Sequence, residues 1–279
     1  GLTLPTFSFM YILFDIGGTK MRIAASLDGA TFSAPVIIST PPRYDAGMAM
    51  LKKSVSDFAG EHKIRAIAGG LPGVFDREKT KILRSPNLPL WEAKPIAEEF
   101  MSEFRVPVIL ENDSALGGLG EALHGAGIGR KIVAYIAIGT GIGGARIVEG
   151  RIDERSHGFE PGHQIIDCGS GRDLESMISG RALEKQYKKL PSEIADPAVW
   201  NEVARVLSCG LANTIVHWSP DVVVLGGAIS QFISLEHLER DVPKFVKVFP
   251  VLPPLRKGVL GDNAGIYGAL QLLKSSDLM

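Results

Sequence analysis

The chain has 279 residues, enough for roughly two domains at about 150 residues each. Hydrophobic residues make up 45% of it and charged residues 22%, as is usual for a globular protein. The 30 basic and 31 acidic side chains leave a net charge of −1. This balance argues against a dedicated nucleic-acid-binding protein, because such proteins need a basic surface.

The cysteine count and the apolar runs exclude further classes. Cys168 and Cys209 are the two cysteines, which excludes a disulfide framework and favours a reducing compartment, so we expect a cytoplasmic protein. No apolar run approaches the ~20 residues that cross a bilayer, so no membrane partner is expected. Residues 1–10 contain no Lys or Arg, so a secretory signal is not expected either. The positive indication is 32 glycines, many of them in pairs.

The first half of the chain alternates between strand-like and helix-like segments. Residues 11–16 are apolar and run into two glycines, as in a buried strand that ends in a tight turn. Residues 44–62 carry Met48, Leu51 and Val55 at helical spacing. The further segments expected here are strands at 21–26, 35–40, 65–68 and 107–110, and helices at 96–104 and 114–123.

The same order of segments restarts in the second half. An apolar strand at 131–138 leads into a glycine turn and a returning strand at 144–148. A helix at 198–218, a strand at 222–225 and a terminal helix at 264–273 follow, and the charged stretch 184–189 suits a solvated helix face. Because both halves open with strand–turn–strand and continue with βα units, the sequence predicts two α/β domains of similar design with a cleft between them.

The first glycine turn has the residues of a phosphate site. Its glycines let backbone N–H groups approach an anion closely, and a neighbouring hydroxyl and two cations add donors and positive charge. Asp15, at the strand end, suits a hydrated Mg²⁺ beside a polyphosphate. The alternative is a plain hairpin turn. The residues concerned are Asp15, Gly17, Gly18, Thr19, Lys20 and Arg22.

A second glycine-rich turn follows a strand in the same way and also suits phosphate binding. It lacks the Gly-Lys-Ser/Thr end of a Walker A loop, and a strand follows it, whereas a helix follows the glycines of a dinucleotide-binding fingerprint. We expect two such turns, one per domain, to hold the phosphates of one nucleotide between them. The residues of the second turn are Gly139, Thr140, Gly141 and Gly143.

Residues 111–113, Glu-Asn-Asp, follow a strand at the expected domain boundary. Asp113 suits a general base that accepts a proton from a substrate hydroxyl as its oxygen attacks phosphorus, and Asn112 can donate and accept hydrogen bonds to a polyol. Alternatively, Asn112 or Asp113 caps the helix that begins at Ser114. Three further side chains suit the several hydroxyls of a sugar: Glu160, His163 and Glu175.

In order and spacing, these motifs resemble those of the ROK family of sugar kinases and repressors, within the actin-like ATPase superfamily. The resemblance runs from Phe14 to about Leu270. Beyond the two glycine turns and Glu-Asn-Asp, residues 70–76 and 86–89 are similar to the family's sugar-side loops, 160–163 to its sugar-binding Glu-x-Gly-His, 220–227 to its adenosine segment and 261–265 to the start of its last helix.

The resemblance implies an α/β, two-domain actin-like ATPase (ribonuclease H-like) fold with an interdomain cleft. It implies a small N-terminal domain at 10–111, a large C-terminal domain at 112–263 and a helix at 264–279 that packs back on the first domain. ATP and Mg²⁺ are the implied cofactors, a sugar is the implied partner, and the family also suggests a homodimer. The implied contacts are Gly73, Asn87, Asn112, Glu160, His163 and Glu175 for the sugar, and Gly226 and Gly227 for the nucleotide.

One segment departs from the family pattern. In the family, Glu-x-Gly-His is usually followed by Cys-x-Cys-Gly-x-x-Gly-Cys-x-Glu, whose cysteines bind a structural zinc ion together with the His. Here the corresponding residues 166–175 keep one of the three cysteines, Cys168. A closed structural zinc site needs four ligands, so we expect no structural zinc. Glu175 keeps the position of the family's sugar-binding Glu.

We therefore expect an ATP-dependent sugar kinase that phosphorylates a hexose hydroxyl, the 6-hydroxyl if the resemblance extends that far, with Asp113 as the base. One alternative is a kinase for an N-acetylhexosamine, either N-acetylmannosamine or N-acetylglucosamine. Another is a non-catalytic sugar sensor or regulator. ROK repressors carry a helix-turn-helix domain before the first phosphate motif, and residues 1–14 are too few for one.

Overall fold

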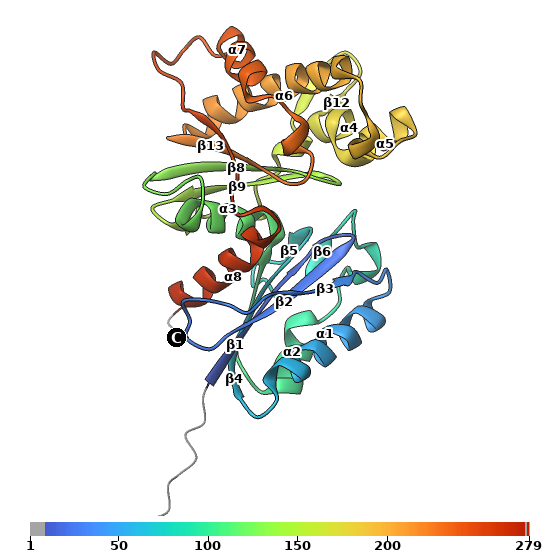
Figure 1. Ribbon diagram of the computed structural model, residues 1–279, viewed down its shortest axis with the longest axis vertical. Coiled ribbons are helices and arrows are strands. Elements are labelled where there is room, and N and C mark those ends of the chain that lie inside the picture. The colour runs from blue at the N-terminus through green and yellow to red at the C-terminus, as the bar shows by residue number, and fades with distance from the viewer. Residues whose placement is uncertain (1–8, 277, 279) are drawn as a thin grey trace, which may run out of the picture. The chain divides into compact units, whose positions relative to one another are not determined.

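The computed structural model of the protein describes residues 9–276 and 278. It consists of two compact units. Each is built on one five-stranded sheet with helices packed against it (Figure 1). Of the described residues, the first unit comprises 9–116, 156–158, 265–276 and 278, and the second comprises 117–155 and 159–264.

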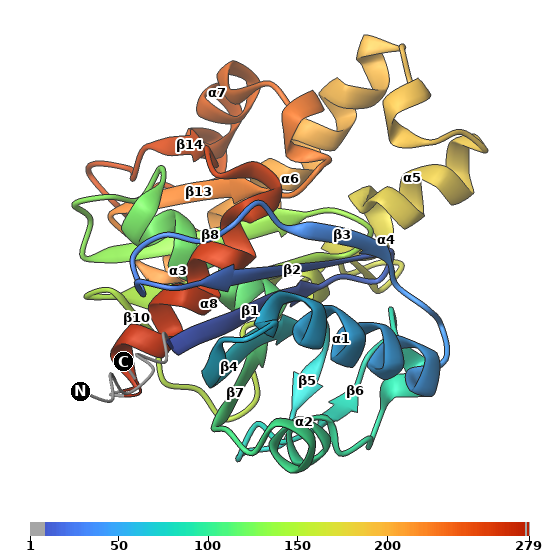
Figure 2. The same ribbon diagram turned by 60° about the horizontal axis from the view of Figure 1, so that its bottom comes forward.

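The sheet of the first unit contains, in spatial order, β3 (Val36–Ser39), β2 (Lys20–Ser26), β1 (Phe9–Ile16), β4 (Lys63–Leu71) and β7 (Val108–Asn112). The predicted hairpin is present, because β1 and β2 pair in antiparallel fashion. The other neighbours of the central strands are parallel, β1 with β4 and β4 with β7, and Figure 2 shows these strands side by side. The carboxyl ends of β1, β4 and β7 therefore share one edge of the sheet.

Both faces of this sheet are covered by helices, as Figure 1 shows. Successive residues of a strand point to opposite faces. Phe14 packs into a core with α1 (Tyr44–Ala59) and α2 (Ile96–Phe104), whereas its neighbour Leu13 packs into a second core with α8 (Ala264–Ser275). Both side chains are fully buried.

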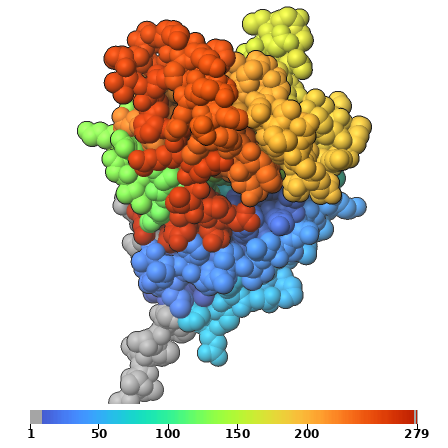
Figure 3. Space-filling view, turned by 45° about the horizontal axis from the view of Figure 1, so that its top comes forward, coloured from blue at the N-terminus to red at the C-terminus, as the bar shows by residue number. Residues whose placement is uncertain are grey.

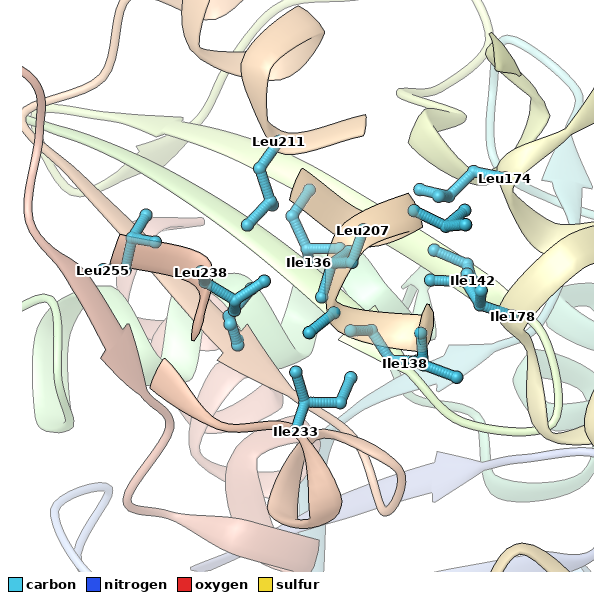
Figure 4. Close-up of a cluster of buried hydrophobic side chains, with 14 of the residues drawn as sticks. Ile136, Ile138, Ile142, Leu174, Ile178, Leu207, Leu211, Ile233, Leu238 and Leu255 are labelled. Carbon is cyan, nitrogen blue, oxygen red and sulfur yellow. The ribbon is translucent and has the colours of Figure 1, made fainter. Parts of the chain in front are cut away.

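The sheet of the second unit contains, in spatial order, β10 (Arg151–Ile152), β9 (Ile142–Val148), β8 (Ile132–Ile138), β13 (Val222–Gly226) and β14 (Leu255–Lys257). β8 and β9 form an antiparallel hairpin, and β13 is parallel to β8 and to β14. Ile136 of β8 packs into one core with Leu207 and Leu211 of α6 (Pro197–Trp218) and with α7 (Leu235–Phe245) (Figure 4). In the space-filling view, residues of the second unit appear in yellow and orange on the visible face (Figure 3).

Shorter elements connect these layers. The two-stranded ribbons are β5 (Val74–Phe75) with β6 (Ile82–Arg84), and β11 (Ile165–Asp167) with β12 (Arg172–Asp173). The remaining helices are α3 (Asp113–His124), α4 (Leu174–Ile178) and α5 (Gly180–Tyr187), and the 3₁₀ turns are η1 (Pro89–Trp91), η2 (Pro161–His163), η3 (Pro191–Glu193), η4 (Ser230–Phe232) and η5 (Gly261–Asn263).

The long elements agree with those that the sequence predicts, and the differences lie at their ends. The helix predicted to reach residue 62 ends at Ala59, where Gly60 has a positive φ of 49°. The strand predicted at 65–68 continues to Leu71 as β4. The glycines that were expected to stop it instead make room for a ring, since a Cβ on Gly69 would lie 2.1 Å from Phe14.

The division between the units falls inside α3, after Leu116, whereas the sequence places the domain boundary just before this helix. Leu116 packs with the α8 core of the first unit, while Gly117 and Gly118 lie against Tyr135 of β8. α8 itself belongs to the first unit, through residues 265–279. Among residues 9–276 and 278, no helix combines the length and the apolar character needed to cross a membrane.

Candidate active site

Two aspartates of the first unit, Asp15 and Asp113, lie close to one glycine. In the parallel ladder, Asp15 of β1 pairs with Gly70 of β4, and Gly70 pairs with Glu111 of β7. A Cβ on Gly70 would lie 3.4 Å from Oδ1 of Asp15 and 3.2 Å from the Cα of Asp113. Asp15 therefore lies at the carboxyl end of β1 and Asp113 directly follows β7, and these parallel strands lie on either side of β4. The carboxyl ends of parallel strands are where open α/β sheets bind ligands.

Asp113 is the first residue of α3. Its Oδ1 accepts the backbone N–H of Ser114 at 2.7 Å and, at the longer distance of 3.4 Å, the Ser114 hydroxyl. Burial raises the pKa of this carboxyl from its ordinary 3.8 to about 6, although the two bonds from Ser114 oppose the shift. A carboxylate with this pKa is mostly ionised at neutral pH and still binds a proton readily, as a general base must.

Asn112 links α3 to the loop before β5. Its Oδ1 accepts the N–H of Ala115 at 3.0 Å, so Asn112 caps the helix. Its Nδ2 donates to the carbonyl of Gly73 at 3.1 Å. Gly73 has a φ of 128°, and a Cβ there would lie 2.4 Å from the carbonyl oxygen of Arg84, so this position requires glycine. Two residues predicted for the sugar side, Asn112 and Gly73, are thus in direct contact.

Glu111 is a buried carboxylate with a cationic partner. Only 2% of its surface is exposed. It forms an ion pair with Lys79, which lies between β5 and β6, and its Oε1 accepts the N–H of Asn112 at 2.8 Å. A buried carboxylate needs such partners to offset the loss of its hydration. Lys79 thereby fastens the β5–β6 hairpin to the strand that carries Asn112 and Asp113.

Thr40 fixes the first glycine turn. Its hydroxyl donates to the carbonyl of Gly17 at 2.8 Å, and its N–H donates to the carbonyl of Thr19 at 3.0 Å. Asn87 lies against the same turn, since a Cβ on Gly18 would be 3.1 Å from the Cβ of Asn87. The carbonyls of Gly17 and Thr19 are therefore occupied by protein donors, and the side chain of Asn87 lies beside Gly18.

The charged residues beside this turn differ in exposure. Lys20 is exposed, whereas Arg22 is half-buried. Arg22 lies directly opposite Asp15 in the β1–β2 ladder, so both side chains are on the same face of the sheet.

The carboxylate of Asp15 lies against a position that must be glycine, Gly265. A Cβ on Gly265, in the first turn of α8, would come within 2.5 Å of the Asp15 carboxylate, whereas one on Gly70 would lie 3.4 Å from Oδ1. A carboxylate oxygen is a hard ligand of the kind that Mg²⁺ uses together with substrate phosphates and water. The residues present therefore fit this cation.

The second glycine turn is closed by its own backbone and by the start of α5. The N–H of Gly139 donates to the carbonyl of Gly141 at 2.9 Å. The N–H groups of Gly180 and Arg181 donate to the carbonyls of Gly139, at 2.8 Å, and Thr140, at 3.2 Å. As in the first turn, protein donors occupy the carbonyl oxygens.

The Gly226-Gly227 pair lies beside this second turn. Gly227 has a φ of 79°, and a Cβ on it would lie 2.4 Å from the carbonyl oxygen of Ile138, the last residue of β8. Gly226 lies against the ring of Tyr135. Since β8 and β13 are parallel, the turn after β8 and the glycines at the end of β13 share one edge of the sheet. Gly143, by contrast, is inside β9.

The Glu-Pro-Gly-His segment packs closely against β9, because the contact contains two glycines, which have no side chain. A Cβ on Gly144 would be 2.6 Å from Cγ of Pro161, and one on Gly162 would be 2.2 Å from a carbonyl oxygen of β9. Glu160 and His163, at the two ends of the segment, are both exposed. This packing presents a carboxylate and an imidazole to solvent from a rigid support.

His163 and Glu175 each have a fixed partner. Nδ1 of His163 lies 3.0 Å from Oδ2 of Asp173. The hydrogen bond to Asp173, with smaller contributions from the charges of Glu175 and Glu160, raises the pKa of His163 against the opposing effect of partial burial. Oε2 of Glu175, in the first turn of α4, accepts the N–H of Ile142 at 2.6 Å, so this carboxylate touches the second glycine turn.

The model of the ROK family matches residues 11–276. The chain belongs to the ROK family. The N-acetyl-D-glucosamine kinase of Vibrio atlanticus is 29% identical over an alignment of 302 positions, gaps included, that spans 93% of this chain and 98% of that protein.

Solved structures of ROK proteins share the fold. The ROK hexokinase from Thermus thermophilus matches with a TM-score of 0.82 at 29% identity, covering 96% of this chain and 99% of its own. A ROK family glucokinase from Streptomyces griseus, solved in complex with glucose and AMPPNP, matches with a TM-score of 0.81 at 24% identity, covering 96% and 100%. The predicted α/β fold of the actin-like ATPase type is confirmed.

The zinc-binding segment of the family has different chemistry in this ROK protein. Within residues 9–276 and 278, no three side chains of His, Cys, Asp or Glu are grouped so that they could hold a metal ion. Nδ1 of His163 is bonded to Asp173, and Cys168 is exposed. These residues do not fit a closed zinc site, which requires four ligands.

The candidate residues of this ROK protein fall into two sets, one in each unit. The first set comprises Asp15, Gly17, Gly18, Thr19, Lys20, Arg22, Gly73, Asn87, Asn112 and Asp113, and the second comprises Gly139, Thr140, Gly141, Gly143, Glu160, His163, Glu175, Gly226 and Gly227. No local pattern pointed to Thr40 and Lys79, because their partners lie 23 and 32 residues away along the chain. Asp173 carried a usable signal, because it stands at a helix N-cap position.

Proposed function

We propose that this ROK-family sugar kinase transfers the terminal phosphoryl group of ATP to the 6-hydroxyl of a hexose, with Asp113 as the general base. The observation that carries the proposal is the placement of Asp15 and Asp113 against Gly70, at the carboxyl ends of parallel strands. One carboxylate suits the cation of a nucleotide, and the other suits the proton of the attacking hydroxyl. The glucose and AMPPNP complex of the Streptomyces griseus glucokinase, which has this fold, supports both substrates.

Asp113 accepts the proton as the hydroxyl oxygen attacks phosphorus. Its bonds from Ser114 engage Oδ1, so Oδ2 is the oxygen proposed to take the proton. With a pKa of about 6, the group is ionised in most molecules at neutral pH. Asn112, held by Gly73 and by the helix it caps, uses its second amide N–H to orient a neighbouring sugar hydroxyl.

The phosphates are assigned to the two glycine turns. In the first unit, the backbone N–H groups of the turn, with Lys20 and Arg22, neutralise phosphate charge. Asp15 would hold Mg²⁺, which would supply further charge neutralisation on the transferring phosphoryl group. In the second unit, the groups assigned to the nucleotide are the second turn with Gly226 and Gly227, and those assigned to the sugar are Glu160, His163 and Glu175.

The second candidate acceptor is a 2-acetamido sugar, because the Vibrio atlanticus relative is an N-acetyl-D-glucosamine kinase. ADP release measured with ATP across glucose, mannose, fructose, N-acetylglucosamine and N-acetylmannosamine tests the proposal and chooses between the acceptors. We expect the wild-type chain to turn over at least one of these sugars. Asp113→Asn should release ADP at no more than a small residual rate. Binding of a sugar without ADP release from any of them would overturn the kinase proposal in favour of a sensor.

A further inference from the structure

Asp173 joins three pieces of the second unit. Its backbone pairs with Ile165 in the β11–β12 ribbon. One side-chain oxygen, Oδ1, accepts the N–H of Ser176 at 2.8 Å and so caps α4. The other, Oδ2, lies 3.0 Å from Nδ1 of His163. Each carboxylate oxygen thus has a separate partner.

We propose that Asp173 is a positioning residue for sugar binding, which holds the His163 ring in one orientation with its proton on Nδ1. This inference rests on the proposed function, because His163 is one of the groups assigned to the sugar. The bond that one ring nitrogen makes decides which nitrogen carries the proton. In the neutral ring, Nδ1–H is donated to Asp173 and the opposite nitrogen Nε2 is left to accept a hydrogen bond from a sugar hydroxyl.

The surrounding segment is held by carboxylates in the place where the family pattern uses zinc. Asp167 accepts the N–H of Gly169 at 3.0 Å, and its other oxygen binds the Ser170 hydroxyl and lies 3.3 Å from the Arg172 guanidinium. At the other end of the ribbon, the carboxylate of Asp173 likewise binds Ser176 and His163. Two aspartates with backbone and side-chain donors therefore replace metal coordination as the means of ordering this loop.

The position of Asp173 also bears on Glu175, two residues further on. The N–H of Leu174 donates to the carbonyl of Gln164 at 3.0 Å, so the start of α4 is fastened beside the Glu-Pro-Gly-His segment. Glu175 then reaches the N–H of Ile142. A variant that loses the cap of α4 would disturb this contact as well, so a clean test must keep the cap.

Asp173→Ser meets this condition. Serine caps helices about as well as aspartate, but its hydroxyl is too short to replace the carboxylate oxygen that contacts His163. Asp173→Asn keeps the length of the side chain and an acceptor oxygen. Asp196→Ser is the matched control, because Asp196 caps α6 by accepting the N–H of Ala198 and is not assigned to any substrate.

Steady-state kinetics separate positioning from a structural role. Because a hydrogen bond to a charged group is worth roughly ten-fold or more in binding, Asp173→Ser should raise the sugar KM about ten-fold while kcat and the ATP KM change little. Asp173→Asn should recover part of the loss, and Asp196→Ser should match the wild-type chain. In a His163→Ala background, Asp173→Ser should add almost nothing, since its effect passes through the imidazole.

The tautomer of His163 gives a readout that does not need turnover. Nitrogen-15 NMR of the sugar-free protein, at a pH where the ring is neutral, should show the proton on Nδ1 in the wild-type chain and a shift towards Nε2 in Asp173→Ser. An unchanged tautomer or an unchanged sugar KM in Asp173→Ser would overturn the inference. So would an equal rise in sugar KM on adding Asp173→Ser to the wild-type chain and to His163→Ala. If the wild-type chain phosphorylates no sugar, the proposed function fails, and the NMR spectra with sugar calorimetry still decide the role of Asp173.

Discussion

The Cα of Gly265 lies against the carboxylate of Asp15, although the two residues stand near opposite ends of the chain. A Cβ on Gly265 would be 2.5 Å from Cγ and from Oδ2 of Asp15. Gly265 is the second residue of α8, so the carboxylate lies at a helix N-terminus, where the helix dipole stabilises negative charge. The last helix thereby helps to position the carboxylate assigned to Mg²⁺.

Gly265→Ala should move Asp15 and weaken catalysis with the fold intact. The added methyl group cannot fit unless the carboxylate turns away, and a displacement of about 1 Å in a positioned group can cost on the order of 10²-fold in rate. We expect a raised requirement for Mg²⁺ and ATP, measured by titrating each, with the sugar affinity unchanged by calorimetry. Wild-type Mg²⁺ dependence in a variant with wild-type thermal stability would contradict the assignment of Asp15.

The pKa of Asp113 predicts the acid side of the pH profile. A general base must be ionised, and burial raises the pKa of this carboxyl to about 6, so kcat/KM should fall about ten-fold per pH unit below pH 6 and level off above it. Asp113→Asn should lose at least ~10²–10⁴-fold in kcat, as is typical when a general base is removed. An active Asn variant, or a profile that is flat down to pH 5, would remove Asp113 from this role.

The elements that position these residues could largely be predicted from the sequence, because each leaves a local signal. The apolar run of β1 ends in glycines, so Asp15 could be placed at a strand end beside a turn. Asn112 stands where a helix cap is expected, and the structure confirms that it caps α3. The β8–β9 hairpin with its glycine turn was predicted for the same reason.

The remaining contacts depend on packing that no local pattern encodes. In the sequence, Gly69 and Gly70 indicate the end of a strand, but in the structure they continue β4. The Phe14 ring packs against Gly69 and the backbone of Asp113 against Gly70, where a side chain would collide with them. The two-residue strand β5 is too short to show a strand period in the sequence. The ion pair between Lys79, which follows β5, and Glu111 could therefore not be predicted. α7 contains Pro243, which disfavours a helix interior, and it forms because its apolar side packs on the core of the second unit.

Lys79→Met should destabilise the first unit by leaving Glu111 buried without its cation. Removing one partner of a buried ion pair costs about 3–5 kcal/mol, and because the Lys79 side chain is 39% exposed we expect about 2 kcal/mol, measured by urea denaturation. Adding Glu111→Gln should recover part of this loss. Lys53→Met is the matched control, since Lys53 pairs with Asp57 on the open surface and should cost less than about 0.5 kcal/mol.

Removal of metal should affect this ROK protein only through Mg²⁺. Its loop from Glu160 to Glu175 is held by Asp167 and Asp173, so chelation followed by dialysis should leave thermal stability unchanged. Activity should return in full when Mg²⁺ alone is added, and elemental analysis should find substoichiometric zinc. One tightly bound zinc ion per chain, or activity that returns only with zinc, would show that the carboxylate network does not replace the metal.

Glu175 is assigned to the sugar, yet one of its oxygens is already used to hold the second glycine turn. Glu175→Gln keeps an oxygen that can accept the N–H of Ile142 but loses the negative charge, whereas Glu175→Ala loses both. If the carboxylate serves the sugar with one oxygen and the turn with the other, the sugar KM should rise in both variants, by about ten-fold for loss of a charged hydrogen bond. The ATP KM should rise only in Glu175→Ala, because only there does the turn lose its anchor. Equal ATP KM values in the two variants would show that the bond to Ile142 does not shape the nucleotide site, and an unchanged sugar KM in both would leave the turn as the only role of this residue.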